Sequence, residues 1–446
     1  MQKIIVRNFG PIREAEIEIK GLTILIGEQA SGKSTLAKLI YFFKTLKKDI
    51  YNLARYESVS LENPDNAREL IDKVIENFKL KFKQYFGSTD KLLPNYSVEF
   101  QFSETNSITL SGNPLNISYA DNTFFQIINT LRVNAPAISN LVRNNDFEGL
   151  RFYENRLNEQ LNGLFSDIYD PLFVPAGRNI TVSYPQEFKD YFLAGLSSAS
   201  FNSNPSIDIE LMRHFLGRVA KIQDRFNNQS FKQVANQQIV PHRDRIDEGI
   251  RLVQTVLKGE YSNRGGQSEG IKPTGGRFVI PIFQSSTGQQ EALRILQDIF
   301  LCLVDNKPVF RVIEEPEAHL FPVAQNQIMQ MVSLLSGSGA HQIVITTHSP
   351  YILTACNNLL YPNRIMQSIH ASNGSLSSQI NRIMPNSFWL DPAKFTAYSL
   401  RNGVSSPIYY ESEGLIRENY LDEVFTDMGI QYEAMYNIYA NALTQS

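Results

Sequence analysis

A glycine-rich loop near the amino terminus carries the residue types that bind phosphate groups. Residues 27–34 read GEQASGKS and fit the pattern G-x-x-x-x-G-K-[ST]. The glycines let backbone N–H groups approach phosphate oxygens, Lys33 supplies positive charge, and Ser34 can ligate Mg²⁺. An apolar strand predicted at 22–26 and a helix predicted from Thr35 flank the loop, which disfavours a chance match on a glycine turn. We therefore predict ATP and Mg²⁺ as cofactors, with nucleotide-binding residues Gly27, Ser31, Gly32, Lys33, Ser34 and Thr35.

A pair of carboxylates follows a second apolar strand. Residues 309–313 read VFRVI, and Glu314 and Glu315 come directly after them. In this position one carboxylate can hold Mg²⁺ while the next orients or deprotonates water. We therefore predict Glu314 as a metal ligand together with Ser34, and Glu315 as a catalytic residue. Asp is more usual on the metal side, and the longer Glu314 could reach the ion through a water molecule. The alternative is a solvated acidic strand end.

Two further segments could complete the site. Residues 285–289 read SSTGQ and open a predicted helix; small residues at a helix N-terminus bind anions, although a plain helix cap is the alternative. Residues 343–347 read IVITT, a strand that leads to His348. Its imidazole can donate a hydrogen bond to a γ-phosphate or position water, whereas a lone histidine is more often structural. The order of the four segments favours a catalytic role for His348.

Apolar periodicity predicts the elements that would position these side chains. Strands alternate with helices, which favours an α/β fold with a mostly parallel sheet. The predicted strands cover residues 3–6, 14–19, 22–26, 278–282, 309–313 and 342–346, with a further strand from residue 171 and a hairpin over 97–110. The predicted helices cover residues 67–86, 124–144, 147–165, 188–226, 289–304, 324–335, 413–425 and 432–443, and residues 259–276 are predicted to be a loop.

Composition narrows the class of protein. The chain has 446 residues, 42% of them hydrophobic, and a net charge of −3, so it can bury a core and is not a strongly basic nucleic-acid coat. No apolar run is long enough to span a membrane, and the amino terminus lacks an apolar signal-peptide core. The two cysteines exclude a disulfide framework and a Cys-based zinc site. We expect a soluble, cytoplasmic protein without a membrane partner.

The four segments together resemble the heads of ABC-type ATPases, in which a phosphate loop, a signature loop, a Glu-ended strand and a switch histidine occur in this order. Within that group the chain is similar to SMC and DNA-repair ATPases. It looks closer still to AAA-like ATPases of bacterial anti-phage defence, such as those of Septu and of the phage anti-restriction-induced system (PARIS). The resemblance covers roughly residues 1–45, 170–185 and 270–360. It rests on NFGPIREAEIEI, GEQASGKSTLAKLI, FVPAGRN, STGQQE, EEPEAHLFP and TTHSPYIL.

The resemblance implies a P-loop NTPase head that dimerises head to tail and encloses two nucleotides. Ser286, Gly288 and Gln289 of one subunit would then contact the γ-phosphate held by Lys33 of the other. His348 would be the switch residue, and the loop at 318–320 would cross the dimer interface. Arg178 would lie in a polar loop near the nucleotide.

The head would be interrupted by inserted segments. We expect a mixed or parallel head sheet built from residues 1–45, 171–185 and 266–395. A mainly helical insertion with a β-hairpin would occupy 46–170, a helical insertion 186–265, and a C-terminal extension 396–446.

The resemblance suggests an ATPase subunit of an anti-phage defence complex. It would form a homodimer or higher oligomer, respond to DNA or a phage protein, and control a separate effector, such as a nuclease. A DNA-repair or DNA-scanning ATPase that binds DNA directly is the first alternative. The basic residues at 44–48 and 79–83, with Arg243 and Arg245, could serve it, although solvated helix faces explain them as well. A stand-alone nucleotide switch is the second alternative.

Overall fold

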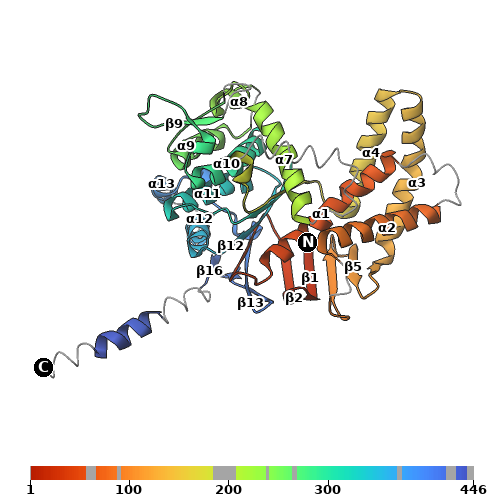
Figure 1. Cartoon of the computed structure of the whole chain (residues 1–446), viewed down its shortest axis with the longest axis horizontal. Coiled ribbons are helices and arrows are strands. Elements are labelled where there is room, and N and C mark those ends of the chain that lie inside the picture. Colours follow the sequence, from red (N-terminus) through yellow and green to blue (C-terminus); the bar gives the residue numbers. More distant parts are fainter. Residues whose placement is uncertain are drawn as a thin grey trace.

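One mixed sheet of 11 strands forms the framework of the protein (Figure 1). The computed structural model describes residues 2–56, 67–87, 92–183, 207–237, 241–263, 269–368, 374–417 and 428–438. The sheet has the order β6-β5-β4-β1-β2-β14-β13-β3-β12-β11-β7. Its strands are β1 (Gln2–Phe9), β2 (Ile12–Ile19), β3 (Leu22–Gly27), β4 (Ser97–Gln101), β5 (Ser107–Ser111), β6 (Asn116–Tyr119), β7 (Asp170–Val174), β11 (Val309–Glu314), β12 (Gln342–Thr347), β13 (Phe395–Arg401) and β14 (Val404–Pro407).

Helices cover both faces of this sheet. The long α-helices are α1 (Lys33–Tyr56), α2 (Ala67–Phe86), α3 (Asp121–Arg143), α4 (Phe147–Phe165), α7 (Ile207–Arg225), α9 (Arg243–Leu257), α10 (Thr287–Asp305), α11 (Pro322–Ser336), α12 (Pro350–Ser368) and α13 (Gly374–Ile383). The short ones are α5 (Ile180–Ser183) and α8 (Phe231–Ala235), with 3₁₀ turns η4 (Ile282–Gln284), η5 (Asn386–Phe388) and η6 (Pro392–Lys394). A further helix spans 428–438.

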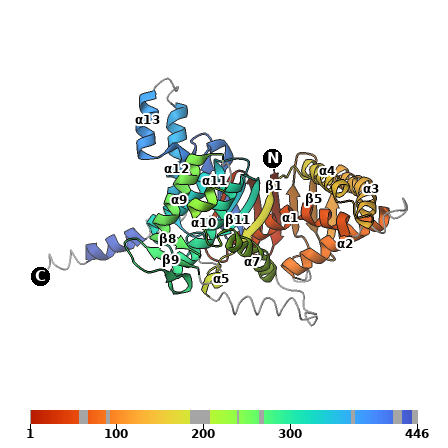
Figure 2. The same cartoon turned by 90° about the horizontal axis from the view of Figure 1, so that it is seen from above.

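The parallel half of the sheet runs from β7 through β11, β12 and β3 to β13, and every neighbouring pair in it is parallel. These strands are apolar on both faces because α1 packs on one face and α10, α11 and α12 on the other. Figure 2 shows this layering from above, with α9, α10 and α11 beside β11. All six residues of β3 and of β11 are buried, which explains their near-continuous apolar runs.

The antiparallel half carries a lobe whose core is continuous with the α1 face of the parallel half. β1 pairs with β2 and β4, and β4, β5 and β6 continue the sheet as a meander. Against it lie α1 to α4, on the right of Figure 1. Aromatic rings dominate this core: Phe42 contacts Phe82 with ring centroids 5.6 Å apart, and Phe43 stacks on Phe100 at 5.0 Å. Such ring pairs add to the stability that burial alone provides.

The predicted α/β class with a mixed sheet is confirmed: the sheet has a parallel core, and antiparallel strands extend it. The helix predicted at 67–86 is α2, and the hairpin predicted at 97–110 is β4 with β5. The helices predicted at 124–144, 147–165, 289–304 and 324–335 correspond to α3, α4, α10 and α11 within a few residues. The part of the predicted helix 188–226 that precedes residue 207 lies outside the described residues.

Two element predictions are wrong, and the strand predicted at 278–282 forms only over Ile280–Pro281, with a 3₁₀ turn from Ile282. Residues 259–276, predicted as a loop, contain β8 (Gly259–Ser262) and β9 (Gly270–Pro273), which form a small sheet with β10 (Ile280–Pro281). The glycines signal close approach there, since a Cβ at Gly259 would lie 2.3 Å from the carbonyl oxygen of Lys272. The helix predicted at 413–425 is a turn and β16 (Leu415–Ile416) as far as residue 417, because β16 pairs with β15 (Tyr409–Tyr410). Residues 418–425 lie outside the described residues.

The 11-stranded sheet also includes strands from segments that were expected to lie outside the head. α1 continues through residue 45, and β4 to β6, from the segment expected to be an insertion, extend the same sheet as β1. Residues 396–446, expected to be an extension, supply most of β13 and all of β14, which lie between β3 and β2. The helix at 428–438 lies apart from the sheet, at the lower left of Figure 1. Among the described helices, none is both long and apolar enough to cross a membrane.

Candidate nucleotide site

Three loops meet at the carboxyl ends of three neighbouring parallel strands. β12 lies between β3 and β11, with Thr347 opposite Ile26 and Thr346 opposite Glu314. The glycine-rich loop follows β3, the carboxylates end β11, and His348 follows β12. In open α/β sheets, ligands bind in the crevice outside the carboxyl ends of the strands. The topology therefore gathers the predicted phosphate loop, the carboxylates and the histidine at one edge of the sheet.

The glycine-rich loop makes a tight turn that only small residues permit. Ala30 and Gly32 have positive φ angles of 59° and 104°. A Cβ at Gly32 would lie 2.9 Å from Cγ1 of Ile12, and one at Gly27 would lie 2.4 Å from a carbonyl oxygen of β13. Both positions thus need glycine. Because α1 begins at Lys33, the unpaired N–H groups of its first turn lie where the loop ends.

Lys33 turns back into its own loop. Its Nζ donates hydrogen bonds to the carbonyl oxygens of Gly27 at 2.9 Å and Glu28 at 2.7 Å, and it lies 3.4 Å from Oγ of Ser31. Burial lowers the pKa of Lys33 to about 8, although the charge of Glu315 opposes the shift. Neutral carbonyls only partly compensate this buried ammonium, and phosphate oxygens would be stronger acceptors.

Ser34 and Glu314 offer oxygen ligands for Mg²⁺. Ser34 is exposed beside the half-buried Thr35, whereas Glu314 is only 7% exposed. Oε2 of Glu314 accepts a hydrogen bond from the backbone N–H of Ala176 at 3.3 Å, and Oε1 is buried without a hydrogen-bond partner. Burial raises the pKa of Glu314, and the Ser34 hydroxyl opposes this. A hard cation would satisfy the bare oxygen, so Ser34 and Glu314 fit Mg²⁺, which prefers oxygen ligands of this kind.

His348 links the loop lysine to the second carboxylate. Its Nδ1 lies 3.5 Å from Nζ of Lys33, and its Nε2 lies 3.4 Å from Oε1 of Glu315. The side chains of His348 and Glu315 are 32% and 40% exposed, so a ligand can reach both. Glu315 has a φ of 43°, an uncommon conformation for a non-glycine residue, and its N–H donates to the carbonyl of Thr346 at 2.9 Å. The chain therefore turns sharply at the end of β11.

A buried arginine holds this turn. Arg178 is fully buried, and its NH1 and NH2 groups donate to the carbonyls of Glu314 at 2.8 Å and Glu315 at 3.0 Å. Its Nε donates to the carbonyl of Glu291 on α10 at 3.1 Å and lies 3.2 Å from the Glu291 carboxylate. Burial lowers the pKa of Arg178, and the charge of Glu291 opposes this. Arg178, which was expected in a polar loop near the nucleotide, thus holds the backbone behind Glu314 and Glu315.

Ser286, Gly288 and Gln289 form the N-terminal cap of α10. Oγ of Ser286 accepts a hydrogen bond from N of Gln289 at 3.4 Å, and Oε1 of Gln289 accepts one from N of Ser286 at 3.1 Å. Nε2 of Gln289 donates to the carbonyl of Leu257 at 2.6 Å. A Cβ at Gly288 would lie 2.6 Å from the carbonyl oxygen of His319, so glycine allows contact with the loop at 318–320. In the part of the chain that the structure describes, the side chains of Ser286 and Gln289 bond within this cap and to Leu257, and they do not reach the phosphate loop.

The model of the AAA ATPase domain family matches residues 1–353. This chain belongs to that family. Among solved structures, this AAA ATPase domain is similar to an SMC head bound to the C-winged helix domain of ScpA, with 14% identity over 91% of this chain and 96% of that one and a TM-score of 0.40. It is also similar to an SMC head domain from Thermotoga maritima, with 13% identity over 91% and 97% and a TM-score of 0.36.

A third similar structure is an Smc head domain with an extended coiled coil, bound to the C-terminal domain of ScpA and derived from Pyrococcus furiosus. It shares 13% identity with this AAA ATPase domain over 92% of this chain and 96% of that one, with a TM-score of 0.37. No curated protein matches the chain.

The AAA ATPase domain contains one site residue that sequence reasoning missed. Oε1 of Glu317 accepts hydrogen bonds from Oγ1 of Thr347 at 2.6 Å and from the backbone N–H of His348 at 2.8 Å. This carboxylate ties the turn after β11 to the end of β12 and so fixes the backbone that carries the imidazole. In the sequence, Glu317 could have been noticed as a further acidic residue two positions after Glu315.

Several basic residues considered for DNA binding are used inside this AAA ATPase domain. Lys44 is fully buried and pairs with Asp167 at 2.8 Å, and Lys47 donates to Oδ1 of Asn162 at 2.8 Å. Lys81 pairs with Asp49. Arg245 donates to two backbone carbonyls, and Arg243 pairs with Asp247. These clusters are therefore not uniform solvent-facing basic stripes.

Proposed function

We propose that this AAA ATPase domain binds ATP with Mg²⁺ and hydrolyses it at the carboxyl ends of β3, β11 and β12. The observation that carries the proposal is the position of His348, which lies 3.5 Å from Lys33 and 3.4 Å from Glu315. A phosphate-binding group, a carboxylate and an imidazole so close together are the groups that hydrolysis of a terminal phosphate requires.

In the proposed reaction, Lys33 exchanges the loop carbonyls for the β- and γ-phosphates. Ser34 and Glu314 would hold Mg²⁺, which neutralises charge on the phosphate oxygens when bound. Glu315 accepts a proton from the attacking water, and His348 hydrogen-bonds to the γ-phosphate. Glu317 and Arg178 keep the two loops in place. The exposure of Ser34, Glu315 and His348 supports direct contact with the nucleotide.

Replacement of Lys33 by Ala tests this function. The loss of charge-assisted hydrogen bonds should weaken ATP binding on the order of 100-fold, measured by isothermal titration calorimetry with MgATP. Lys48→Ala is the matched control, because Lys48 is an exposed lysine of the same helix. Binding of MgATP to Lys33→Ala with wild-type affinity would contradict the proposed site.

A composite site in a homodimer or higher oligomer is the finer part of the proposal. Ser286 is exposed at the N-terminus of α10, where a helix dipole favours an anion. Mixing Lys33→Ala subunits with Ser286→Ala subunits should then restore part of the ATPase activity. No recovery in mixtures whose heterodimers are demonstrated by differential tags would contradict sharing in trans.

For the cellular role we propose a cytoplasmic subunit of an anti-phage defence complex that controls a separate effector, such as a nuclease. The support is the similarity of its motifs to the ATPases of such systems. A DNA-repair or DNA-scanning role receives less support, because Lys44 and Lys47 are used within the fold. Co-expression with the neighbouring open reading frames under phage challenge tests the role. Equal phage sensitivity with and without the Lys33→Ala change would contradict it.

A further inference from the structure

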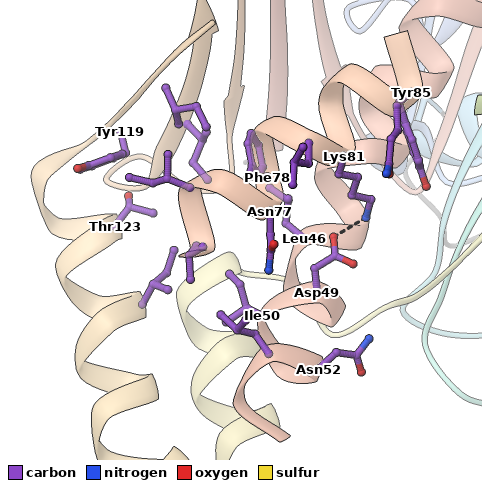
Figure 3. Close-up of a pocket in the computed structure, with 18 of the residues that line it drawn as sticks. Leu46, Asp49, Ile50, Asn52, Asn77, Phe78, Lys81, Tyr85, Tyr119 and Thr123 are labelled. Atoms are coloured by element: carbon purple, nitrogen blue, oxygen red, sulfur yellow. Dashed lines mark hydrogen bonds and ion pairs between the residues drawn. The ribbon is translucent and has the colours of Figure 1, made fainter. Parts of the chain in front are cut away.

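A pocket of about 510 Å³ lies in the lobe of the antiparallel half, outside the nucleotide site (Figure 3). Its walls come from the second half of α1, from α2, β5, β6 and the start of α3, and from α7. The volume lies within the range of small-molecule binding sites. Since its lining residues fall between 46 and 127 and at 210 and 214, the pocket is distinct from the crevice that holds Lys33 and Glu315.

One side of the pocket is hydrocarbon. It is lined by Leu46 and Ile50 of α1, Phe78 of α2, Ile108 of β5 and Ile127 of α3, each at most 9% exposed. These side chains belong to the aromatic-rich core of the lobe. An apolar group that enters here displaces water from a surface that hydrogen-bonds poorly, which favours binding.

The polar side of the pocket is balanced in charge. Lys81 pairs with Asp49, as the dashed line in Figure 3 marks, and Glu210 pairs with Arg213 at 2.9 Å. His214 also lines the pocket, and burial lowers the pKa of its imidazole, so it is neutral at pH 7. Each carboxylate therefore has a cation of its own, and the pocket offers no excess charge to a charged ligand.

One donor in the pocket has no partner. Tyr85 is 5% exposed, and its hydroxyl is buried without a hydrogen-bond partner. Burial raises the pKa of Tyr85, and the charges of Glu210 and Asp49 raise it further, so the hydroxyl keeps its proton. A buried hydroxyl without a partner costs stability, and such groups are rare in folded proteins. The hydroxyl is closed off from the pocket in the unliganded structure, so an acceptor on a bound molecule can reach it, and remove this cost, only after the Tyr85 side chain turns toward the ligand.

We propose that this pocket binds an uncharged, largely apolar small molecule whose hydrogen-bond acceptor meets the hydroxyl of Tyr85. The hydrocarbon side selects the apolar body, the paired charges disfavour ions, and the unpartnered hydroxyl selects an acceptor. The volume of about 510 Å³, lined by four helices and two strands, suits a compact molecule better than a protein segment. The site does not depend on the proposed ATPase function.

Nile red is a suitable probe, because it is an uncharged apolar dye with a carbonyl acceptor. Titrated into the full chain, it should bind saturably, one molecule per chain, with a blue shift of its emission. Val74→Trp places a large ring in the pocket and should weaken binding at least tenfold, whereas Val323→Trp, at a site on α11 that is 56% exposed, should not. Lys33→Ala should bind the dye as the wild type does, which separates this site from the nucleotide site.

Tyr85→Phe is the second variant, and it removes only the hydroxyl. Binding of the dye should weaken about twofold to tenfold, the value of one hydrogen bond, while the thermal unfolding midpoint stays the same or rises. A fluorescence rise that does not saturate would overturn the proposal. So would equal dye affinity in the wild type, Val74→Trp and Tyr85→Phe proteins.

Discussion

The carboxylate segment at 314–317 and the signature loop at 285–289 are held in opposite ways. The carboxylate segment is fixed by other elements: Arg178 binds its carbonyls, β12 binds the N–H of Glu315, and Glu317 reaches Thr347. The signature loop is fixed mainly by its own helix, through the reciprocal cap of Ser286 and Gln289, and one further bond from Gln289 reaches Leu257 of α9. The carboxylate segment is thus held by contacts from several other elements of the chain, whereas the signature loop remains exposed to solvent.

This difference matches a division of labour in the proposed reaction. A group that must align a water molecule needs tight positioning, because small displacements of reacting groups cost large factors in rate. A loop that meets another subunit needs an exposed surface and a stable local structure. Arg178 joins the carboxylate segment to the helix that carries the signature loop, since it donates to Glu291 on α10 and to the turn after β11.

The largest effect on ATP hydrolysis is expected for Glu315→Gln, in the carboxylate segment. Removing the base should slow ATP hydrolysis about 100-fold or more while ATP binding remains, and so favour an ATP-bound dimer. Single-turnover hydrolysis and size-exclusion chromatography with ATP measure the two effects. Glu28→Gln is the control, because Glu28 lies exposed in the phosphate loop. Unchanged turnover in Glu315→Gln would remove its role as base.

Two matched helix caps test the role of the signature loop. Ser286 and Ser230 both form a capping box with a glutamine three residues later, on α10 and α8. Ser286→Ala and Ser230→Ala should each cost about 1 kcal/mol of stability. If Ser286 contacts a nucleotide in trans, only Ser286→Ala should also lower kcat, by a factor on the order of 100 at most. Equal activity of the two variants in thermally stable samples would reduce Ser286 to a helix cap.

Local sequence patterns were sufficient for the residues on three loops of the site. A short apolar strand precedes each of Lys33, Glu315 and His348. Such a strand and the polar residue after it can be recognised without knowing which strands pair. Because the three strands are parallel neighbours, these residues lie together at one edge of the sheet. The order of β3, β12 and β11 itself followed only from the structure, because strand order is set by contacts between distant segments.

Residues that act through distant partners were harder to predict. Lys44 looked like part of a basic helix face, yet it is fully buried against Asp167, 123 residues away. The strands β13 and β14 enter the sheet between β3 and β2 from a region expected to be an extension. Arg178 was expected in a polar loop near the nucleotide, and its burial behind Glu314 depends on the packing of α10. Periodicity cannot reveal such partners because they are far apart in sequence.

The smallest effect is expected for Arg178→Lys, which tests whether the two regions are coupled. Lysine keeps the charge but lacks the planar fork that reaches Glu291, Glu314 and Glu315 together. As a positioning residue, Arg178 should affect kcat more than KM, with about a tenfold loss in kcat from misplaced carboxylates. Arg294→Lys is the control, because Arg294 is also fully buried and paired, but its partner Glu269 lies outside the carboxylate segment. Equal losses of kcat in the two variants would show that Arg178 acts only through stability, and the coupling of the carboxylate segment to α10 would then have to be abandoned.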